Sequence, residues 1–337
     1  MPTALVTGSA GFIGYHLCER LLADNWTVVG FDGMTDYYDV ALKRQRHALL
    51  GENPNFRAVE DRLEKDRILH DLLAETKPNV VFHLAAQAGV RYSIDAPRSY
   101  VDSNLIGTFN LLEAVRATPV EHLLMASTSS VYGANTVMPY AESHKADMQM
   151  SFYAATKKAN ESMAHSYSHL YGIPVTMFRF FTVYGPWGRP DMALFKFTKA
   201  ILNGDPIDVY NHGRMRRDFT YIDDLVEALS RLIDAVPAGP NDGQPTIPND
   251  SLSAVAPFRV VNVGNANPVA LMDFISALEQ ALGSEAKKNF LDMQPGDVPA
   301  TSADTTLLTE LTGYRPSMDV AEGVKKFVTW YRDYYGE

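Results

Sequence analysis

Short runs of β-branched and aliphatic residues alternate with helical hydrophobic patterns through the first half of the chain. The predicted strands are residues 3–8, 27–32, 79–86, 122–127 and 174–181. The predicted helices are residues 14–25, 63–76, 104–118 and 152–172. Each strand is a nearly continuous apolar run, which is typical of parallel strands buried on both faces. The pattern therefore predicts an α/β fold with a doubly wound parallel sheet of the Rossmann-like type.

The character of the chain changes after about Thr182, where Pro and Gly become more frequent and the elements become shorter. The helices and the strand predicted in this part are residues 223–236, 258–264, 270–283 and 323–335. Residues 237–257 are rich in Pro, Gly, Asn and Asp, which predicts a surface loop. The predicted division is a large sheet domain, residues 1–181 with 219–265 returning to it, and a smaller α/β domain, residues 182–218 and 266–337.

Composition and charge narrow the classes of partner. The 337 residues are 46% hydrophobic, which is enough for a large core. The net charge of −10 argues against nucleic acid or an anionic membrane as the partner, so an anionic ligand must meet a local group of basic residues. Cys18 is the single cysteine, which excludes an intrachain disulfide. We find no signal peptide and no apolar run of membrane length, and we expect a reducing, cytoplasmic setting.

The segment "VTGSAGFIG" carries three glycines, Gly8, Gly11 and Gly14, between a predicted strand and a predicted helix. Glycines at such a junction permit a tight turn and the close approach of a pyrophosphate to the helix N-terminus. Asp32 ends the next strand, where an acid can bind the adenosine ribose hydroxyls and disfavours a 2′-phosphate. We therefore expect NAD rather than NADP. Three basic residues follow on what we expect to be a solvated helix face: Lys43, Arg44 and Arg46.

A tyrosine and a lysine follow one turn apart in "YAATK", on one face of the long predicted helix. They are Tyr153 and Lys157, and a lysine in this place can stabilise a phenolate, so that the tyrosine can act as a general base. Four hydroxyl side chains, residues 127–130, come at the end of the preceding strand. Because ligands bind at the carboxyl ends of parallel strands, we expect these groups to lie beside the glycine motif.

Six segments together resemble the extended short-chain dehydrogenase/reductase family. They are "TGSAGFIG", "HLAAQAGV", "SSVYG", "YAATK", "RFFTVYGPWGRPDMA" and "RRDFTYIDD". Within that family they are similar to the nucleotide-sugar epimerases, and most to the UDP-glucuronate 4-epimerase group. The resemblance runs nearly from end to end. It implies a tightly held NAD and an inversion at the sugar C4 through a transient 4-keto sugar, which would convert UDP-glucuronate to UDP-galacturonate.

The resemblance also assigns roles to residues. Tyr153 would take the proton of the sugar 4-hydroxyl, with Lys157 beside it and Thr128 sharing the proton relay. The cofactor contacts would be Gly8, Gly11, Phe12, Ile13, Gly14, Asp32, Asp61, Arg62, Leu84, Ala85, Ala86, Asn104, Tyr153 and Lys157. Relatives often have Asn-Leu-Asn where this chain has residues 33–35, so side-chain contacts to the adenosine from that loop do not carry over. The helices around residues 99–117 and 152–171 would pair in a homodimer.

The substrate side needs cations, and "NHGRMRRD" supplies three of them, although a solvated basic turn would give the same pattern. Among them Arg217 matches a pyrophosphate ligand of the family. Tyr210 matches an aromatic that stacks on uracil, and Asp297 matches a ribose contact. Many relatives have Arg where this chain has Gln294, which places more of the pyrophosphate binding on Arg217. Two further residues would lie near the sugar: Thr182 and Arg189.

Ser129 and Ser130 would donate hydrogen bonds to the glucuronate carboxylate. The alternative is that they only satisfy backbone groups at the strand end. Dehydratase and decarboxylating relatives carry acids in this stretch, and a UDP-glucose 4-epimerase would not need both hydroxyls.

An NAD-sensing binding module would be expected to lack Tyr153 or Lys157. A hydrolase is disfavoured because the chain has no G-x-S-x-G elbow. A histidine pair with metal-like spacing, His165 and His169, fits a plain helix face better than a metal site.

Overall fold

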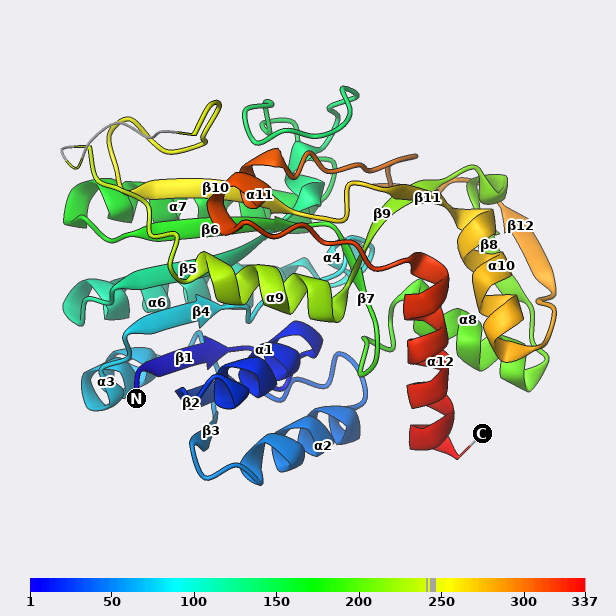
Figure 1. The fold of residues 1–337 in the computed structure, drawn as a ribbon, viewed down its shortest axis with the longest axis horizontal. Coiled ribbons are helices and arrows are strands. Elements are labelled where there is room, and N and C mark those ends of the chain that lie inside the picture. Colours follow the sequence, from blue (N-terminus) through cyan, green and yellow to red (C-terminus); the bar gives the residue numbers. More distant parts are fainter. Residues whose placement is uncertain (241, 243–246, 337) are drawn as a thin grey trace.

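The computed structural model describes residues 1–240, 242 and 247–336, and its centre is a seven-stranded sheet (Figure 1). The strands are β1 (Thr3–Thr7), β2 (Thr27–Asp32), β3 (Phe56–Glu60), β4 (Val80–His83), β5 (His122–Thr128), β6 (Val175–Phe180) and β10 (Phe258–Val263). They lie in the order β10-β6-β5-β4-β1-β2-β3, and every neighbouring pair is parallel. The predicted fold class is confirmed.

Helices cover both faces of this sheet (Figure 1). One layer consists of α1 (Phe12–Ala23), α2 (Val40–Gly51) and α9 (Ile222–Leu232), and the other of α3 (Ile68–Thr76), α6 (Gly107–Ala117) and α7 (Phe152–Tyr171). Successive side chains of β1 serve the two layers: Ala4 and Val6 belong to one core cluster and Leu5 to the other. The burial of both faces explains why the strands are apolar at consecutive positions.

Most of the remaining elements gather at the end of the sheet toward which β1 points (Figure 1). A three-stranded sheet is formed by β7 (Thr182–Tyr184), β9 (Arg216–Tyr221) and β11 (Pro268–Ala270), and a two-stranded sheet by β8 (Ile207–Tyr210) and β12 (Lys288–Leu291). The helices at this end are α8 (Ala193–Asn203), α10 (Leu271–Leu282) and α12 (Val320–Tyr335), whereas α11 (Thr306–Thr312) lies against α9 and β10. The rings of Phe219 and Phe274 stack at 4.3 Å and join β9 to α10. The predicted domain boundaries stay a prediction.

Two of the predicted helices differ from those in the structure. The helix predicted from residue 63 begins at Ile68, after Arg67 in a left-handed conformation (φ 61°). The pattern at 104–118 is a π-helix, Val101–Ile106, that continues into α6. The short helices α4 (Tyr92–Asp95) and α5 (Pro97–Tyr100) come before it. Of the predicted loop 237–257, residues 241 and 243–246 lie outside the described residues.

Candidate active site

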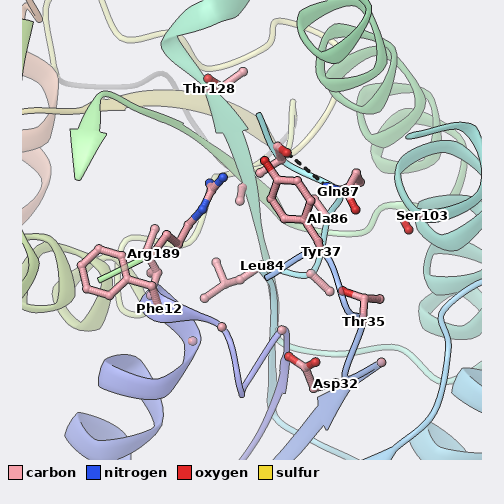
Figure 2. A pocket seen from close by; sticks show the side chains of 18 of the residues that line it. Phe12, Asp32, Thr35, Tyr37, Leu84, Ala86, Gln87, Ser103, Thr128 and Arg189 are labelled. Atoms are coloured by element: carbon pink, nitrogen blue, oxygen red, sulfur yellow. Dashed lines mark hydrogen bonds between the residues drawn. The ribbon is translucent and has the colours of Figure 1, made fainter. Parts of the chain in front are cut away.

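Two adjoining cavities lie at the carboxyl ends of the sheet strands. The first runs from the turn after β1, past Asp32 at the end of β2, to Thr128 at the end of β5 (Figure 2). Figure 2 shows Asp32 and Thr128 at opposite ends of the view, with the Arg189 side chain reaching in between. The position agrees with the rule that open parallel sheets bind ligands beyond the carboxyl ends of their strands.

The glycine turn is shaped for a close approach of backbone to ligand. Gly8 has φ +77°, and a Cβ atom on it would lie 2.8 Å from the Ala85 nitrogen. A Cβ atom on Gly14 would lie 2.1 Å from the Gly8 oxygen, so α1 can reach the turn only with glycine there. No side chain caps the start of α1, which leaves its first N–H groups for an anionic ligand. The turn therefore fits the pyrophosphate of a dinucleotide.

The carboxylate of Asp32 holds this turn against the next loop. It accepts hydrogen bonds from the Ala10 nitrogen at 3.0 Å and the Met34 nitrogen at 2.9 Å, and the residue is 7% exposed. Most predicted cofactor residues line the first cavity: Gly8, Gly11, Phe12, Ile13, Gly14, Asp32, Arg62, Leu84, Ala85, Ala86, Tyr153 and Lys157. Two do not. Asp61 accepts from the Arg62 nitrogen, and Asn104 is buried against Gln87.

Two basic residues of α2 correct the sequence-based prediction of a solvated face. Arg44 is exposed as predicted, but Lys43 is 5% exposed and Arg46 is fully buried. The Lys43 ammonium donates to the carbonyl of Thr35 at 2.7 Å, and the residue lines the first cavity. Burial lowers the pKa of Lys43. Arg46 donates to the Ala10 carbonyl at 2.8 Å and the Trp187 carbonyl at 2.5 Å. Arg46 therefore ties the glycine turn to the segment after β7, which explains its burial.

Tyr153 and Lys157 lie on the face of α7 that packs against β5. The Lys157 ammonium is buried and donates to the carbonyl of Ala126 at 2.7 Å. Desolvation lowers the pKa of Lys157 to about 8, while the Glu161 carboxylate one turn later acts in the opposite direction. Desolvation also raises the pKa of the Tyr153 phenol, and the Thr128 hydroxyl opposes that rise. The tyrosine, the lysine and the threonine thus form one cluster at the cavity.

The second cavity has a volume of about 670 Å³ and adjoins the first. All the predicted substrate residues line it: Thr128, Ser129, Ser130, Thr182, Arg189, Tyr210, Arg217 and Asp297. Three of the residues named so far, Thr128, Tyr153 and Arg189, line both cavities. A ligand in the second cavity and a cofactor in the first would therefore meet at the phenol of Tyr153.

The hydroxyl run at the end of β5 divides into an inner and an outer part. Ser127 is buried and its hydroxyl donates to Glu161 at 2.7 Å, away from the second cavity. Thr128 caps the 3₁₀ turn Ser129–Tyr132, because its hydroxyl oxygen accepts from the Ser130 nitrogen at 3.2 Å. The hydroxyls of Thr128 and Ser130 are 3.3 Å apart. The run from Thr128 to Ser130 therefore presents its polar groups to the second cavity.

Several cavity residues were not predicted from the sequence. Tyr37 lines both cavities, and its hydroxyl donates to Asp191 at 3.0 Å. Arg91 lies with its guanidinium 4.5 Å from the centre of the Tyr210 ring and 3.0 Å from Asp297. The segments "DYYD" (residues 36–39) and "VRYS" (residues 90–93) lie a few residues after the ends of β2 and β4. That position in the chain is the signal that could have indicated both residues.

The histidine pair on α7 holds a loop. The His165 ring lies 2.9 Å from the Ser253 hydroxyl, and the His169 ring lies 2.7 Å from the Val255 carbonyl. Within residues 1–240, 242 and 247–336, no group of three or more His, Cys, Asp and Glu side chains is placed to hold a metal ion. Within the same residues, no helix is both long and apolar enough to span a bilayer.

Comparison with known proteins decides the family. The sequence model of the NAD dependent epimerase/dehydratase family matches residues 4–247. The chain belongs to this family. A protein of Rhizobium meliloti (strain 1021) named "Probable UDP-glucuronate 4-epimerase" is 57% identical over 332 residues, which are 98% of this chain and 97% of that protein. The recognised resemblance is thereby confirmed, and so is NAD as the cofactor.

Solved structures of family members match over nearly the whole chain. The UDP-glucuronic acid 4-epimerase of Bacillus cereus, in complex with UDP-glucuronic acid and NAD, has a TM-score of 0.87 and 32% identity, with coverage of 99% of this chain and 100% of that one. A UDP-glucose 4-epimerase of Thermotoga maritima with UDP-glucose has a TM-score of 0.84 and 26% identity, with 99% coverage of both chains. The family fold is therefore shared.

Proposed function

We propose that this protein is an NAD-dependent UDP-glucuronate 4-epimerase, which interconverts UDP-glucuronate and UDP-galacturonate through a transient 4-keto sugar. One observation carries the proposal: Tyr153 and Thr128 line both cavities, and the hydroxyls that follow Thr128 face the cavity beyond. A sugar held there would have its 4-hydroxyl at the phenol and its C6 group near the serines. The names of the relatives from Rhizobium meliloti and Bacillus cereus support the same activity.

In this mechanism the residues of the chain bind the sugar and move one proton. The Tyr153 phenolate takes the proton of the sugar 4-hydroxyl, becomes the neutral phenol, and returns the proton after the ring has turned over. The positive charge of Lys157 favours the phenolate form that accepts this proton. Thr128 would share the proton relay through its hydroxyl. Bound NAD would supply the reversible oxidation at C4, and its pyrophosphate would lie on the glycine turn.

The nucleotide part of the substrate would occupy the outer end of the second cavity. We assign the uracil to Tyr210, the ribose to Asp297 and the diphosphate to Arg217. Desolvation lowers the pKa of Arg217 while Asp297 opposes the change, as expected for a cation that is partly withdrawn from water. A diphosphate would provide a stronger counter-charge for this guanidinium than the carbonyl of Arg216, to which it donates at 3.0 Å.

The serines would hold the glucuronate carboxylate while C4 is oxidised. A glucuronate oxidised at C4 is a β-keto acid, which loses CO₂ when the carboxylate bond aligns with the π system of the carbonyl. An epimerase must hold that bond out of alignment. We assign this task to the hydroxyls of Ser129 and Ser130, which lie at the start of the 3₁₀ turn that Thr128 caps.

The second candidate is a UDP-glucose 4-epimerase, favoured by the similarity to the Thermotoga maritima enzyme. Incubation of the purified protein with UDP-glucuronate and with UDP-glucose in separate reactions tests both, with the products separated and assigned by NMR. We expect UDP-galacturonate from the first and little or no UDP-galactose from the second. Turnover of UDP-glucose but not of UDP-glucuronate would identify the protein as a UDP-glucose 4-epimerase instead. A 4-keto pentose as the main product would identify a decarboxylase instead.

We also propose a homodimer in a cytoplasmic setting, with two domains divided as predicted from the sequence. Ile106 and Phe109, at the start of α6, are 37% and 49% exposed. Leu170 and Tyr171, at the end of α7, are 63% and 47% exposed. These apolar side chains on two neighbouring helices support a helix-to-helix contact between subunits. Because β10 lies beside β6 in the large sheet, its position supports the return of residues 219–265 to the first domain.

A further inference from the structure

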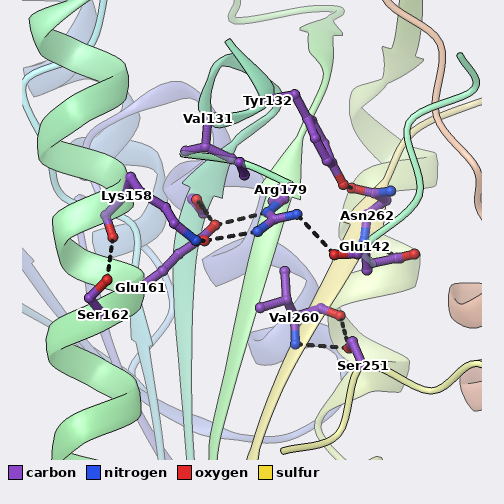
Figure 3. Close-up of polar contacts among 12 residues, drawn as sticks. Val131, Tyr132, Glu142, Lys158, Glu161, Ser162, Arg179, Ser251, Val260 and Asn262 are labelled. Atoms are coloured by element: carbon purple, nitrogen blue, oxygen red, sulfur yellow. Dashed lines mark hydrogen bonds and ion pairs between the residues drawn. The ribbon is translucent and has the colours of Figure 1, made fainter. Parts of the chain in front are cut away.

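A buried ion pair joins α7 to β6, one helical turn after Lys157 (Figure 3). The guanidinium of Arg179, on β6, binds the carboxylate of Glu161, on α7, through two parallel hydrogen bonds of 2.9 Å each. The two side chains are 4% and 3% exposed. Lys158, which is 33% exposed, donates to the same carboxylate at 2.9 Å, and the Ser127 hydroxyl donates to it at 2.7 Å. Every acceptor position of this carboxylate therefore faces a donor.

Lys157 and Glu161 together join α7 to the end of β5 over successive turns of the helix. Tyr153, Lys157 and Glu161 are spaced by four residues and share one face of the helix. Lys157 binds the Ala126 carbonyl and Glu161 binds the Ser127 hydroxyl, so two adjacent residues of β5 are each held by a different turn of α7. This arrangement fixes the register between the strand that carries Thr128 and the helix that carries the phenol.

The charges around Lys157 come from every element packed on it. On its own helix the Glu161 carboxylate favours the charged form of Lys157, and on β5 the ammonium donates to a carbonyl. Arg179, on β6, and Lys158 share the Glu161 carboxylate. His83, on β4, is buried between Thr7 and Thr108, and desolvation lowers its pKa to about 3, so it remains neutral. Arg189, beyond the phenol, bears a positive charge. Glu161 is therefore the anion that favours the charged form of this desolvated ammonium.

We propose that Glu161 is a positioning residue of the epimerase reaction, which holds α7 against β5 and keeps Lys157 charged so that Tyr153 can act as a base. This inference rests on the proposed function, because the reaction is the proposed epimerisation. It gives a role to the buried carboxylate of Glu161, which lines neither cavity. The fold could have placed an apolar pair here, because replacing a buried ion pair by apolar side chains of similar size is often neutral or stabilising.

The experiment is Glu161→Gln in the full-length protein loaded with NAD, with two readouts across a pH series. The first is kcat for UDP-glucuronate, whose alkaline limb reports loss of the Lys157 proton. The second is the phenolate absorbance of Tyr153, taken as the difference from the corresponding Tyr153→Phe protein. We expect the alkaline limb to move to lower pH by about one unit, since removing a nearby opposite charge shifts a pKa by roughly one to three units. Above the limb, kcat should fall about tenfold, and the phenol should titrate at higher pH.

Two further variants separate charge from folding. Glu161→Asp keeps the charge and should return the limb toward that of the parent. Glu161→Met combined with Arg179→Met removes the whole pair without leaving a buried charge, so it should fold and still show the shifted limb. Lys158→Gln is the control, because it removes the exposed donor and leaves the buried pair intact. The proposal would be overturned if neither readout moved, that is, if the alkaline limb and the phenol titration both stayed at the parent pH in Glu161→Gln and in the double variant. A parent with no turnover on UDP-glucuronate would instead refute the proposed function, and the phenol titration would still decide the role of Glu161.

Discussion

Glu142 offers a test of stability against pH in the same region. Its carboxylate accepts from the Asn262 nitrogen at 2.7 Å, and its carbonyl receives a weak hydrogen bond from Arg179 at 3.4 Å (Figure 3). Desolvation raises the pKa of Glu142 from 4.5 to about 7, although the hydrogen bond from Asn262 opposes the rise. The folded protein therefore prefers the neutral acid. Below the unfolded pKa of 4.5 the group is neutral in both states and does not lower the free energy of unfolding. As the pH rises from there through about 7, ionisation costs more in the folded state, and the free energy of unfolding falls.

The size of the effect follows from the shift. A rise from 4.5 to about 7 corresponds to about 3 kcal/mol at roughly 1.36 kcal/mol per pKa unit. Because Glu142 keeps some contact with water, we expect a measured effect of about 1 to 3 kcal/mol. Glu142→Gln should remove the penalty, because the amide stays neutral at every pH and its oxygen can still accept from Asn262. The variant should equal the parent well below pH 4.5 and exceed it in stability at pH 8 and above.

Urea unfolding of parent and variant at a series of pH values measures this difference, with m-values compared to exclude a change of unfolded state. Glu285→Gln, at an exposed carboxylate, is the control and should show no such dependence. Subtracting the parent curve removes the contribution of the other acidic residues. A stability difference that is the same at pH 5 and pH 8, or a variant less stable than the parent at pH 8, would refute the reasoning.

Four further outcomes are expected. Tyr153→Phe should lower kcat by about two orders of magnitude or more and leave UDP-glucuronate binding nearly unchanged by calorimetry; near-parent turnover would remove the phenol from the mechanism. Ser129→Ala with Ser130→Ala should bind UDP-glucuronate about a hundredfold more weakly and release CO₂ with NADH accumulating, as seen by NMR and absorbance. Unchanged affinity without CO₂ would contradict the carboxylate role. Denatured protein should release one NAD per chain, and release of NADP would contradict the assignment of Asp32. Light scattering should show that the parent is a dimer and that Phe109→Ser shifts it toward monomer. A monomeric parent would exclude the proposed homodimer.

The sheet and α7 could be predicted because their signals are local. The strand from residue 174 to 181 is apolar at most positions, and the helix that carries Tyr153 has a serine cap, Ser151, and a glycine stop. The glycine turn follows from spacing and from the strand before it. Such features depend on a few neighbouring residues, so a pattern can identify them.

The buried charges could not be predicted in the same way, because their partners lie far along the chain. Lys43 and Arg46 occupy helix positions that a periodicity argument assigns to solvent, yet they bind backbone oxygens of other loops. Glu161 and Arg179 meet only when α7 packs on β6. One signal was nevertheless present: Arg179 is a charged residue within an otherwise apolar strand, and such a residue requires a partner when the strand is buried.

The position of β10 has a consequence for synthesis on the ribosome. The strand that covers the outer edge of β6 is residues 258–263, and the chain builds β7, β8 and β9 before it returns there. Until residue 263 has emerged, β6 presents the unpaired backbone groups and buried-type side chains of a sheet edge. Nascent or truncated chains that end before this strand are thus candidates for chaperone binding or aggregation. Attempts to divide the protein into two separately expressed halves should keep β10 with the N-terminal half.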